Sequence, residues 1–149
     1  MTGVYPVFDN IFKIGTKGVT SATEDMKTIA DMESFSVSLD NGIEEWNPMD
    51  TGGWTRRLTT AKSVSISLNG KRNVGDAGND YVAGLAWVTG QNANSKFEWT
   101  LPSGAKVSFN CVVNVTSLGG DSTNVDALEV EILSDGAVTY TAPSAEGQV

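Results

Sequence analysis

The sequence predicts a mainly β protein: an antiparallel β-sandwich with one short flanking α-helix. Five segments alternate apolar and polar residues, which is the pattern of strands with one buried and one exposed face. Sixteen glycines and many Ser, Thr and Asn residues favour turns and strands over long helices. With 149 residues, 40% of them hydrophobic and 19% charged, the chain is expected to fold as one domain around one core.

The clearest strands are expected where every second residue is apolar. The apolar positions of the five segments are Phe35, Val37 and Leu39; Val64, Ile66 and Leu68; Phe97, Trp99 and Leu101; Val107, Phe109, Cys111, Val113 and Val115; and Leu128, Val130 and Ile132. Shorter strands are expected in NIFKIG (10–15), MKTIADM (26–32) and AVTYTA (137–142), which gives six to eight in all. The turn PSGA (102–105) predicts that the strands on either side of it form an antiparallel pair.

One short helix is expected within NDYVAGLAWVTGQ (79–91). Asn79 or Asp80 would cap its N-terminus, and Gly90 would end it. A helix of this length is marginal alone, so its apolar stripe should pack on the sheet. On this interpretation Tyr81 and Trp87 are packing residues rather than a platform for a ligand.

Residues typical of catalytic and metal sites are scarce. The chain has no histidine, which removes the common general base, the usual nitrogen ligand of zinc and every Ser-His or Cys-His pair. The single cysteine, Cys111, lies in an apolar alternation and is interpreted as a buried structural thiol. The segment GDAGND (75–80) lacks a dinucleotide fingerprint, and GGDSTNVDALE (119–129) reads as a polar hairpin loop without EF-hand spacing. We therefore expect no enzyme activity, no cofactor and no bound metal.

The charge balance and the apolar runs limit the partners. The net charge of −8 disfavours direct binding of DNA or RNA, because affinity for phosphates comes largely from Lys and Arg. The bases cluster only at Arg56–Arg57 and Lys71–Arg72, which suits salt bridges or interfaces. No stretch approaches the ~18 apolar residues of a membrane span, and the N-terminus lacks the pattern of a signal peptide. We expect a protein made and used in soluble form, without a membrane.

An oversized connection separates two of the clear strands. It spans residues 40–61 and contains EEWNPMDTGGWTRR (44–57). Structureless connections beyond ~12–15 residues are uncommon and usually functional or disordered. Acids lead the segment, arginines follow, and Trp and Arg are favoured anchors of interfaces. We predict an inter-subunit loop with the contact residues Glu44, Glu45, Trp46, Trp54, Arg56 and Arg57; the alternative is a loop folded back over its own sheet.

The polar faces of the predicted strands are small, hydroxylated and almost free of charge. Ser63, Ser65 and Ser67 form one such face, and Ser108 and Asn110 belong to another. Monomers usually protect strand edges with charges, prolines or bulges, so flat uncharged strands suggest edges that are covered by other copies. The alternative is an ordinary solvated sheet face.

The chain contains, in this order, YPVFDNIFKIG, IADMESFSVSLDNGIEEWNPMDTGGWTRRL, SISLNGKRNVGDAGNDYVAGLAW and FEWTLPSGAKVSFNCVVNV. This arrangement resembles the tail tube (major tail) proteins of tailed bacteriophages, over about residues 4–141. The resemblance implies a β-sandwich whose inner sheets join, in a hexameric ring, into a continuous β-barrel. A tail-tube domain (11–140) is expected between an N-terminal arm (1–10) and a flexible C-terminal tail (141–149).

The resemblance also implies a function. The rings would stack into the phage tail tube, first around a tape-measure protein and later as the conduit for DNA ejection into the host. Further implied partners are the tail terminator and distal tail proteins, while double-stranded DNA would pass without specific binding. Assembly would occur in the host bacterial cytoplasm, and the product would lie in the virion tail. The long loop would contact an adjacent subunit or ring, and the serine and asparagine faces named above are the candidate lumen face.

A second function remains open at the level of sequence. Trp46 and Trp54 could stack on sugar rings, as the aromatic residues of a monomeric β-sandwich carbohydrate-binding module do.

Overall fold

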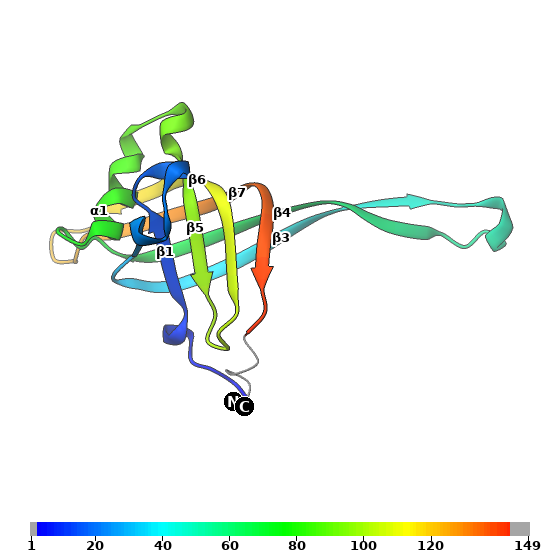
Figure 1. Ribbon diagram of the computed structural model, residues 1–149, viewed down its shortest axis with the longest axis horizontal. Helices are drawn as coiled ribbons and strands as arrows, with labels where there is room; N and C mark the ends of the chain where they lie inside the picture. Colours follow the sequence, from blue (N-terminus) through cyan, green and yellow to red (C-terminus); the bar gives the residue numbers. More distant parts are fainter. Residues whose placement is uncertain (1–2, 144–149) are drawn as a thin grey trace.

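A computed structural model describes residues 3–143 of the chain, which form one antiparallel sheet with short helices at one end (Figure 1). The strands are β1 (Ile11–Gly15), β2 (Met26–Thr28), β3 (Met32–Trp46), β4 (Arg56–Lys71), β5 (Asn94–Thr100), β6 (Lys106–Gly119) and β7 (Ala127–Thr141). They lie in the order β2-β1-β5-β6-β7-β4-β3. The predicted mainly β, antiparallel fold with one short α-helix is confirmed, as is the β5–β6 pair across PSGA.

A bend in β7 divides this sheet into two layers. The first part of β7 pairs with both β4 and β6, whereas residues 138–141 pair with β6 alone. Between the two parts the register shifts, and Gly136 adopts a positive φ of 93° that glycine tolerates best. The strand visibly changes direction there (Figure 1). The segment AVTYTA, expected as a separate strand, is therefore the continuation of β7 beyond its bend.

The core fills the space between the layers. Phe12 of β1 and Phe35 of β3 meet edge to face at 4.9 Å, although these strands lie far apart in the sheet order. Cys111 is fully buried as predicted, and its burial raises the pKa of the thiol to about 12. The buried apolar residues are Phe12, Ile14, Ile29, Ile66, Leu68, Val82, Ala83, Leu85, Phe97, Phe109, Cys111, Val113, Leu128, Val130 and Ile132.

The helix α1 (Ala77–Gly84) covers one end of the core, into which Val82 and Ala83 are buried. Asp76 is its N-cap and accepts a hydrogen bond from the Asn79 N–H at 2.9 Å, so the predicted caps Asn79 and Asp80 were wrong. Tyr81 packs partly against the core. Trp87 is 80% exposed, which contradicts its assignment as a packing residue. The chain leaves the helix at Gly84, well before the predicted end at Gly90, so the apolar stripe stops short of Trp87.

Short 3-10 turns complete the secondary structure. They lie at Val7–Asp9, Gly18–Thr20, Thr23–Asp25, Met49–Thr51, Leu85–Trp87 and Gly90–Ala93. The first of them precedes β1, where the Trp99 indole N–H donates to Asn10 Oδ1 at 2.8 Å. Residues 144–149 of the expected C-terminal tail lie outside the described residues. No helix within 3–143 is long and apolar enough to cross a membrane.

The run GKRNVGDAGND (70–80) folds around the side chain of Asn79. Its amide nitrogen donates to the carbonyls of Ala30 and Lys71, each at 3.0 Å. Its Oδ1 accepts from the Arg72 guanidinium and from the Asn73 N–H, also at 3.0 Å. Asn79 is fully buried with both polar atoms satisfied. The run therefore joins the end of β4, the start of α1 and the segment before β3.

Candidate assembly interface

Strands β3 and β4 continue beyond the sheet as a two-stranded hairpin, which we call the arm and define as residues 40–63 (Figure 1). β7 pairs with β4 only from Ser65 onwards, so the arm has no third strand. None of its residues is buried. An isolated two-stranded hairpin is at best marginally stable in water, so packing against another surface would stabilise the arm.

The arm corrects the expected secondary structure of residues 40–61. Strand pairing continues to Trp46 opposite Arg56, so only residues 47–55 form a turn, not the whole connection. Leu39, expected to face the core, is exposed because the hairpin leaves the body at this point: Leu39 pairs with Val64, just before the first β4 residue that β7 pairs with. The arm also projects away from the body, which contradicts a loop folded back over its own sheet (Figure 1).

Four of the predicted contact residues form two cross-strand pairs near the end of the arm. Arg57 donates from Nε to Glu45 Oε1 at 2.9 Å. The guanidinium of Arg56 lies 5.5 Å from the ring centroid of Trp46. Successive residues of a strand point to opposite faces, so the two pairs lie on opposite faces of the arm.

The turn at 47–55, which we call the tip, is held by its own hydrogen bonds. The Thr51 hydroxyl donates to the Trp54 carbonyl at 2.8 Å, and the Thr55 hydroxyl donates to Asn47 Oδ1 at 2.7 Å. Gly52 and Gly53 take positive φ values of 62° and 91°. Met49 is 97% exposed and Trp54 80% exposed. The tip is thus an ordered structure that presents large apolar side chains to solvent.

The five candidate lumen residues lie on one face of the continuous sheet, which we call the outer face. Residues directly opposite each other in an antiparallel pair share a face. Ser65 lies opposite Leu133 of β7, which lies opposite Val112 of β6. Asn110 and Ser108 follow Val112 at period two, and Ser67 and Ser63 flank Ser65 in the same way. The two predicted polar faces thus belong to the same face of the sheet, with Ser108 beyond the bend of β7.

The charges on the outer face differ between its two parts. Beside the β4 serines the charged residues are acidic: Glu131 pairs in register with Ser67, and Glu129 with Asn69. Beside Ser108 and Asn110 both signs occur, because Glu98 and Lys96 of β5 lie opposite them. The part of the outer face around Ser67 and Asn69 is therefore negative, with Lys71 at the end of β4 paired to Glu33, whereas the β5–β6 part is mixed.

The end of the body opposite the arm is formed by α1 and the β6–β7 turn (Figure 1). The chain near this end carries exposed apolar side chains that the sequence did not mark as an interface. We define this end patch as Val74, Trp87, Leu118 and Val125, all of them exposed. Trp87 and Leu118 line a cavity of about 340 Å³ together with Arg72 and Asp126. In the sequence, this patch is indicated only by a single valine in each of two polar turns, Val74 in RNVGD and Val125 in TNVDA.

The charges around the end patch are only partly paired. Arg72 Nη1 lies 2.7 Å from Asp80 Oδ1. The hydrogen bond from Arg72, followed by one from the Gly75 N–H, lowers the pKa of Asp80 below its ordinary value. Within residues 3–143, neither Asp121 nor Asp126 of the β6–β7 turn forms an ion pair. The end patch therefore carries acidic groups beside its apolar side chains.

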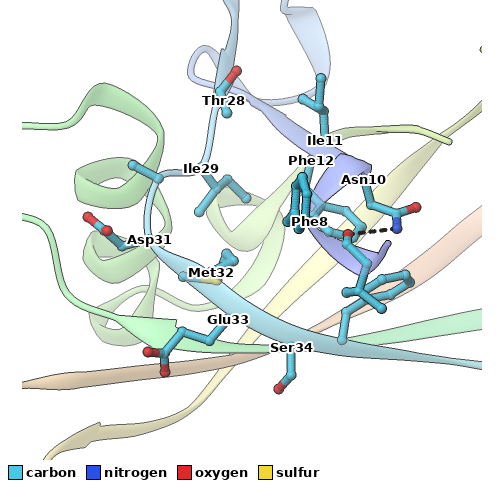
Figure 2. A pocket seen from close by; sticks show the side chains of 13 residues that line it. Phe8, Asn10, Ile11, Phe12, Thr28, Ile29, Asp31, Met32, Glu33 and Ser34 are labelled. Atoms are coloured by element: carbon cyan, nitrogen blue, oxygen red, sulfur yellow. Dashed lines mark hydrogen bonds between the residues drawn. The ribbon is translucent and has the colours of Figure 1, made fainter. Parts of the chain in front are cut away.

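A groove of about 510 Å³ lies where β1 faces the start of β3 (Figure 2). Phe8, Ile11, Ile29 and Met32 are among the apolar side chains that line it, with Asp31 and Glu33 beside them. Glu33 forms an ion pair with Lys71 at 3.2 Å. The groove thus exposes apolar surface between two strands that do not hydrogen-bond to each other.

The part of the chain that the structure describes offers no obvious centre for chemistry. It contains no group of three or more His, Cys, Asp or Glu side chains that could hold a metal ion. Every buried side-chain nitrogen or oxygen in residues 3–143 has a hydrogen-bond partner. The notable surfaces are those suited to contact with other chains: the arm, the outer face, the end patch and the groove.

Comparison with known proteins agrees with this description. The family model described as phage tail tube protein matches residues 9–140. A search of curated proteins gave no match. The fold is similar to that of a chain in the tail of an empty gene transfer agent (GTA) particle with C6 symmetry, at 20% identity and a TM-score of 0.73. It is also similar to a chain in the virion of a native GTA particle, at 20% identity and a TM-score of 0.69. Each likeness covers 93% of this chain and 100% of the other.

Proposed function

The chain belongs to the phage tail tube protein family, and we propose that it self-assembles into hexameric rings that stack into the tail tube of a virion. The tube would be the conduit for DNA ejection into the host. The similarity to a chain of a C6-symmetric tail supports the sixfold ring. Residues 11–140 would be the tail-tube domain, preceded by an N-terminal segment at residues 1–10.

The observation that carries this proposal is the arm. It is an ordered two-stranded hairpin with no third strand and no buried residue, and its tip exposes Met49 and Trp54. The arm contributes little to the stability of a monomer, because none of its residues is part of the core. It suits an inter-subunit contact, for which Trp and Arg are favoured anchors.

The ends of the sheet support closure into a ring. Among residues 3–143, β3 pairs with β4 only, so one edge of this strand has no partner strand there, and β2 forms the other end of the sheet. Between Ser34 and Leu39 the sequence places no charge or proline that would protect that edge. Closing a sheet into a barrel removes free edges, and a barrel made by six subunits would do so here.

The charge of the outer face is consistent with the proposed role as a conduit for DNA. Six copies at −8 each would carry a formal −48 per ring. If the outer face lines the lumen, Glu131 and Glu129 place negative charge opposite Ser67 and Asn69. A wall of this sign repels phosphates, so DNA could slide past without specific binding.

The remaining roles follow from the family. Tape-measure, tail terminator and distal tail proteins would be partners, and assembly would take place in the host cytoplasm before the protein becomes part of the virion tail. We assign a structural rather than an enzymatic role. The alternative of a sugar-binding module is less well supported, because Arg56 already stacks on Trp46.

Electron microscopy of concentrated purified protein tests the proposal. Rings or hollow tubes with sixfold end-on views are expected. A protein that stays monomeric at high concentration in sedimentation velocity, and that binds glycans on an array, would instead support the carbohydrate-binding alternative.

A further inference from the structure

We propose that the end patch receives the tip of the arm from a second copy of this chain in the next ring. This inference rests on the proposed function and adds to it the surface on which the arm docks. The occupant of the patch is thus a segment of an identical chain.

The first argument is the placement of the two surfaces. The arm projects from one end of the longest axis of the molecule, and α1 with the β6–β7 turn lies at the other end (Figure 1). A contact between two different surfaces of identical chains is heterologous, and when it does not close it builds an open stack. A copy displaced along the long axis would bring a tip to an end patch, and every further copy would repeat the contact.

The second argument is the match in chemistry. The tip offers Met49 and Trp54, while the end patch offers Trp87 and Leu118 around a cavity of about 340 Å³. All four side chains are exposed in the single chain. Burial of large apolar and aromatic side chains from both partners is the main stabilising contribution in protein interfaces.

The third argument is charge. The sequence has three arginines, and two of them, Arg56 and Arg57, lie next to the tip. Arg56 stacks on Trp46 and forms no ion pair within residues 3–143. Asp121 and Asp126 beside the end patch are likewise without an ion pair there. Arg57 is paired with Glu45 and the tip itself carries Asp50, so the complementarity with the acidic β6–β7 turn rests on Arg56.

Site-directed cross-linking tests this contact. The single native cysteine, Cys111, is fully buried and should not react, so introduced cysteines report alone. Met49→Cys at the tip is mixed with Val125→Cys at the end patch, assembled, and treated with a short bis-maleimide. The matched control mixes Met49→Cys with Ser103→Cys, an exposed position in the β5–β6 turn. The assembled contact should give at least about tenfold more cross-linked dimer with Val125→Cys than with Ser103→Cys, because it holds the two thiols at high effective concentration.

The outcomes separate this inference from the proposed function. If the wild-type chain forms no rings or tubes, the proposed function fails and this inference fails with it. If tubes form but the two mixtures cross-link equally, the end patch is not the docking surface and the tail tube role stands.

A charge-reversal cycle decides the matter if the cysteine variants do not assemble. Arg56→Asp and Asp126→Arg should each lower the yield of tubes, and the double variant should recover at least about half of it because the pair is restored with opposite signs. A double variant no better than the worse single variant would overturn the inference.

Discussion

Glu45 and Arg57 face each other across the arm, with Oε1 and Nε 2.9 Å apart. On the other face of the same hairpin, Arg56 stacks on Trp46 at 5.5 Å. Both side chains of the ion pair are more than half exposed, at 55% and 61%. Exposed ion pairs contribute little to stability, so these contacts orient the residues of the arm rather than hold the body together.

Shortening the arm should separate folding from assembly. Ile43 lies opposite Thr59, so replacing residues 44–58 by Asn-Gly leaves a hairpin with a two-residue turn in the same register. No buried residue is lost, so the midpoint of thermal unfolding should stay within about 4 °C of wild type, while tubes should be absent by electron microscopy. Normal tubes would show that the arm does not stack the rings, and an unfolded variant would show that the monomer depends on it.

The Glu45–Arg57 pair should couple weakly in the isolated monomer. A double-mutant cycle with Glu45→Ala and Arg57→Ala, followed by urea unfolding, should give a coupling free energy of at most about 0.5 kcal/mol, because both side chains remain solvated. The coupling should also weaken at high ionic strength. A value above about 1.5 kcal/mol would mean that the arm is far less exposed in solution than this structure shows.

Asn79 should be one of the most sensitive polar positions. Asn79→Ala leaves the carbonyls of Ala30 and Lys71 without their donor and the Asn73 N–H without its acceptor. We expect a loss of about 3 kcal/mol in the free energy of unfolding, measured in urea. The matched control Asn92→Ala changes an exposed asparagine and should alter it by no more than about 0.5 kcal/mol. Equal losses of unfolding free energy in the two variants would contradict a stabilising role for the hydrogen bonds of Asn79.

The body of the sheet was predictable from the sequence because its strands have one face in the core. Ile66, Leu68, Val130 and Ile132 sit at the buried positions that period two predicts. The arm was not predictable in the same way, since both its faces meet solvent and alternation stops at Asp40. Its strands are defined by cross-strand pairs such as Glu45 with Arg57, and sequence spacing alone does not reveal such pairs.

Two other features depended on long-range contacts. Asn79 and Asp80 are both good N-cap residues, but the Asn79 side chain donates to Ala30 and Lys71 and Asp80 pairs with Arg72, while Asp76 caps the helix. The two polar faces share one face of the sheet because β7 lies between β4 and β6, and only the strand order and register reveal this. Among the candidate interface residues, those of the arm were expected from their residue types. Trp87 was missed because the helix was expected to continue to Gly90, which would have placed Trp87 on its packed face.

Two glycines of α1 should respond in opposite ways to alanine. A Cβ on Gly78 would collide with the backbone carbonyl of Thr28, whereas a Cβ on Gly84 would meet open space at a helical φ of −64°. Gly78→Ala should destabilise the protein by about 2 kcal/mol or more, because helix and β2 must separate. Gly84→Ala should stabilise it by about 0.5 kcal/mol through higher helix propensity. Thermal unfolding of the two variants side by side checks both signs, and a neutral Gly78→Ala would refute the close approach of α1 to β2.

The buried thiol of Cys111 should make stability fall at alkaline pH. Its pKa is raised from 9.0 to about 12, chiefly because burial penalises the thiolate. A group whose pKa is raised on folding contributes its full stability below the unfolded pKa and loses it as the pH rises toward the folded pKa, so the window runs from about 9 to about 12.

Other groups also titrate in that window, so the measurement is a comparison with Cys111→Ala. Between pH 8 and pH 10.5 the free energy of unfolding of the wild type should fall by about 2 kcal/mol more than that of the variant, because the unfolded thiol ionises and the folded thiol does not. Any cost of the substitution itself is the same at both pH values and cancels. Parallel curves for the two proteins would mean that the thiol ionises as readily in the fold as in the unfolded chain, contrary to its position between the layers of the sheet.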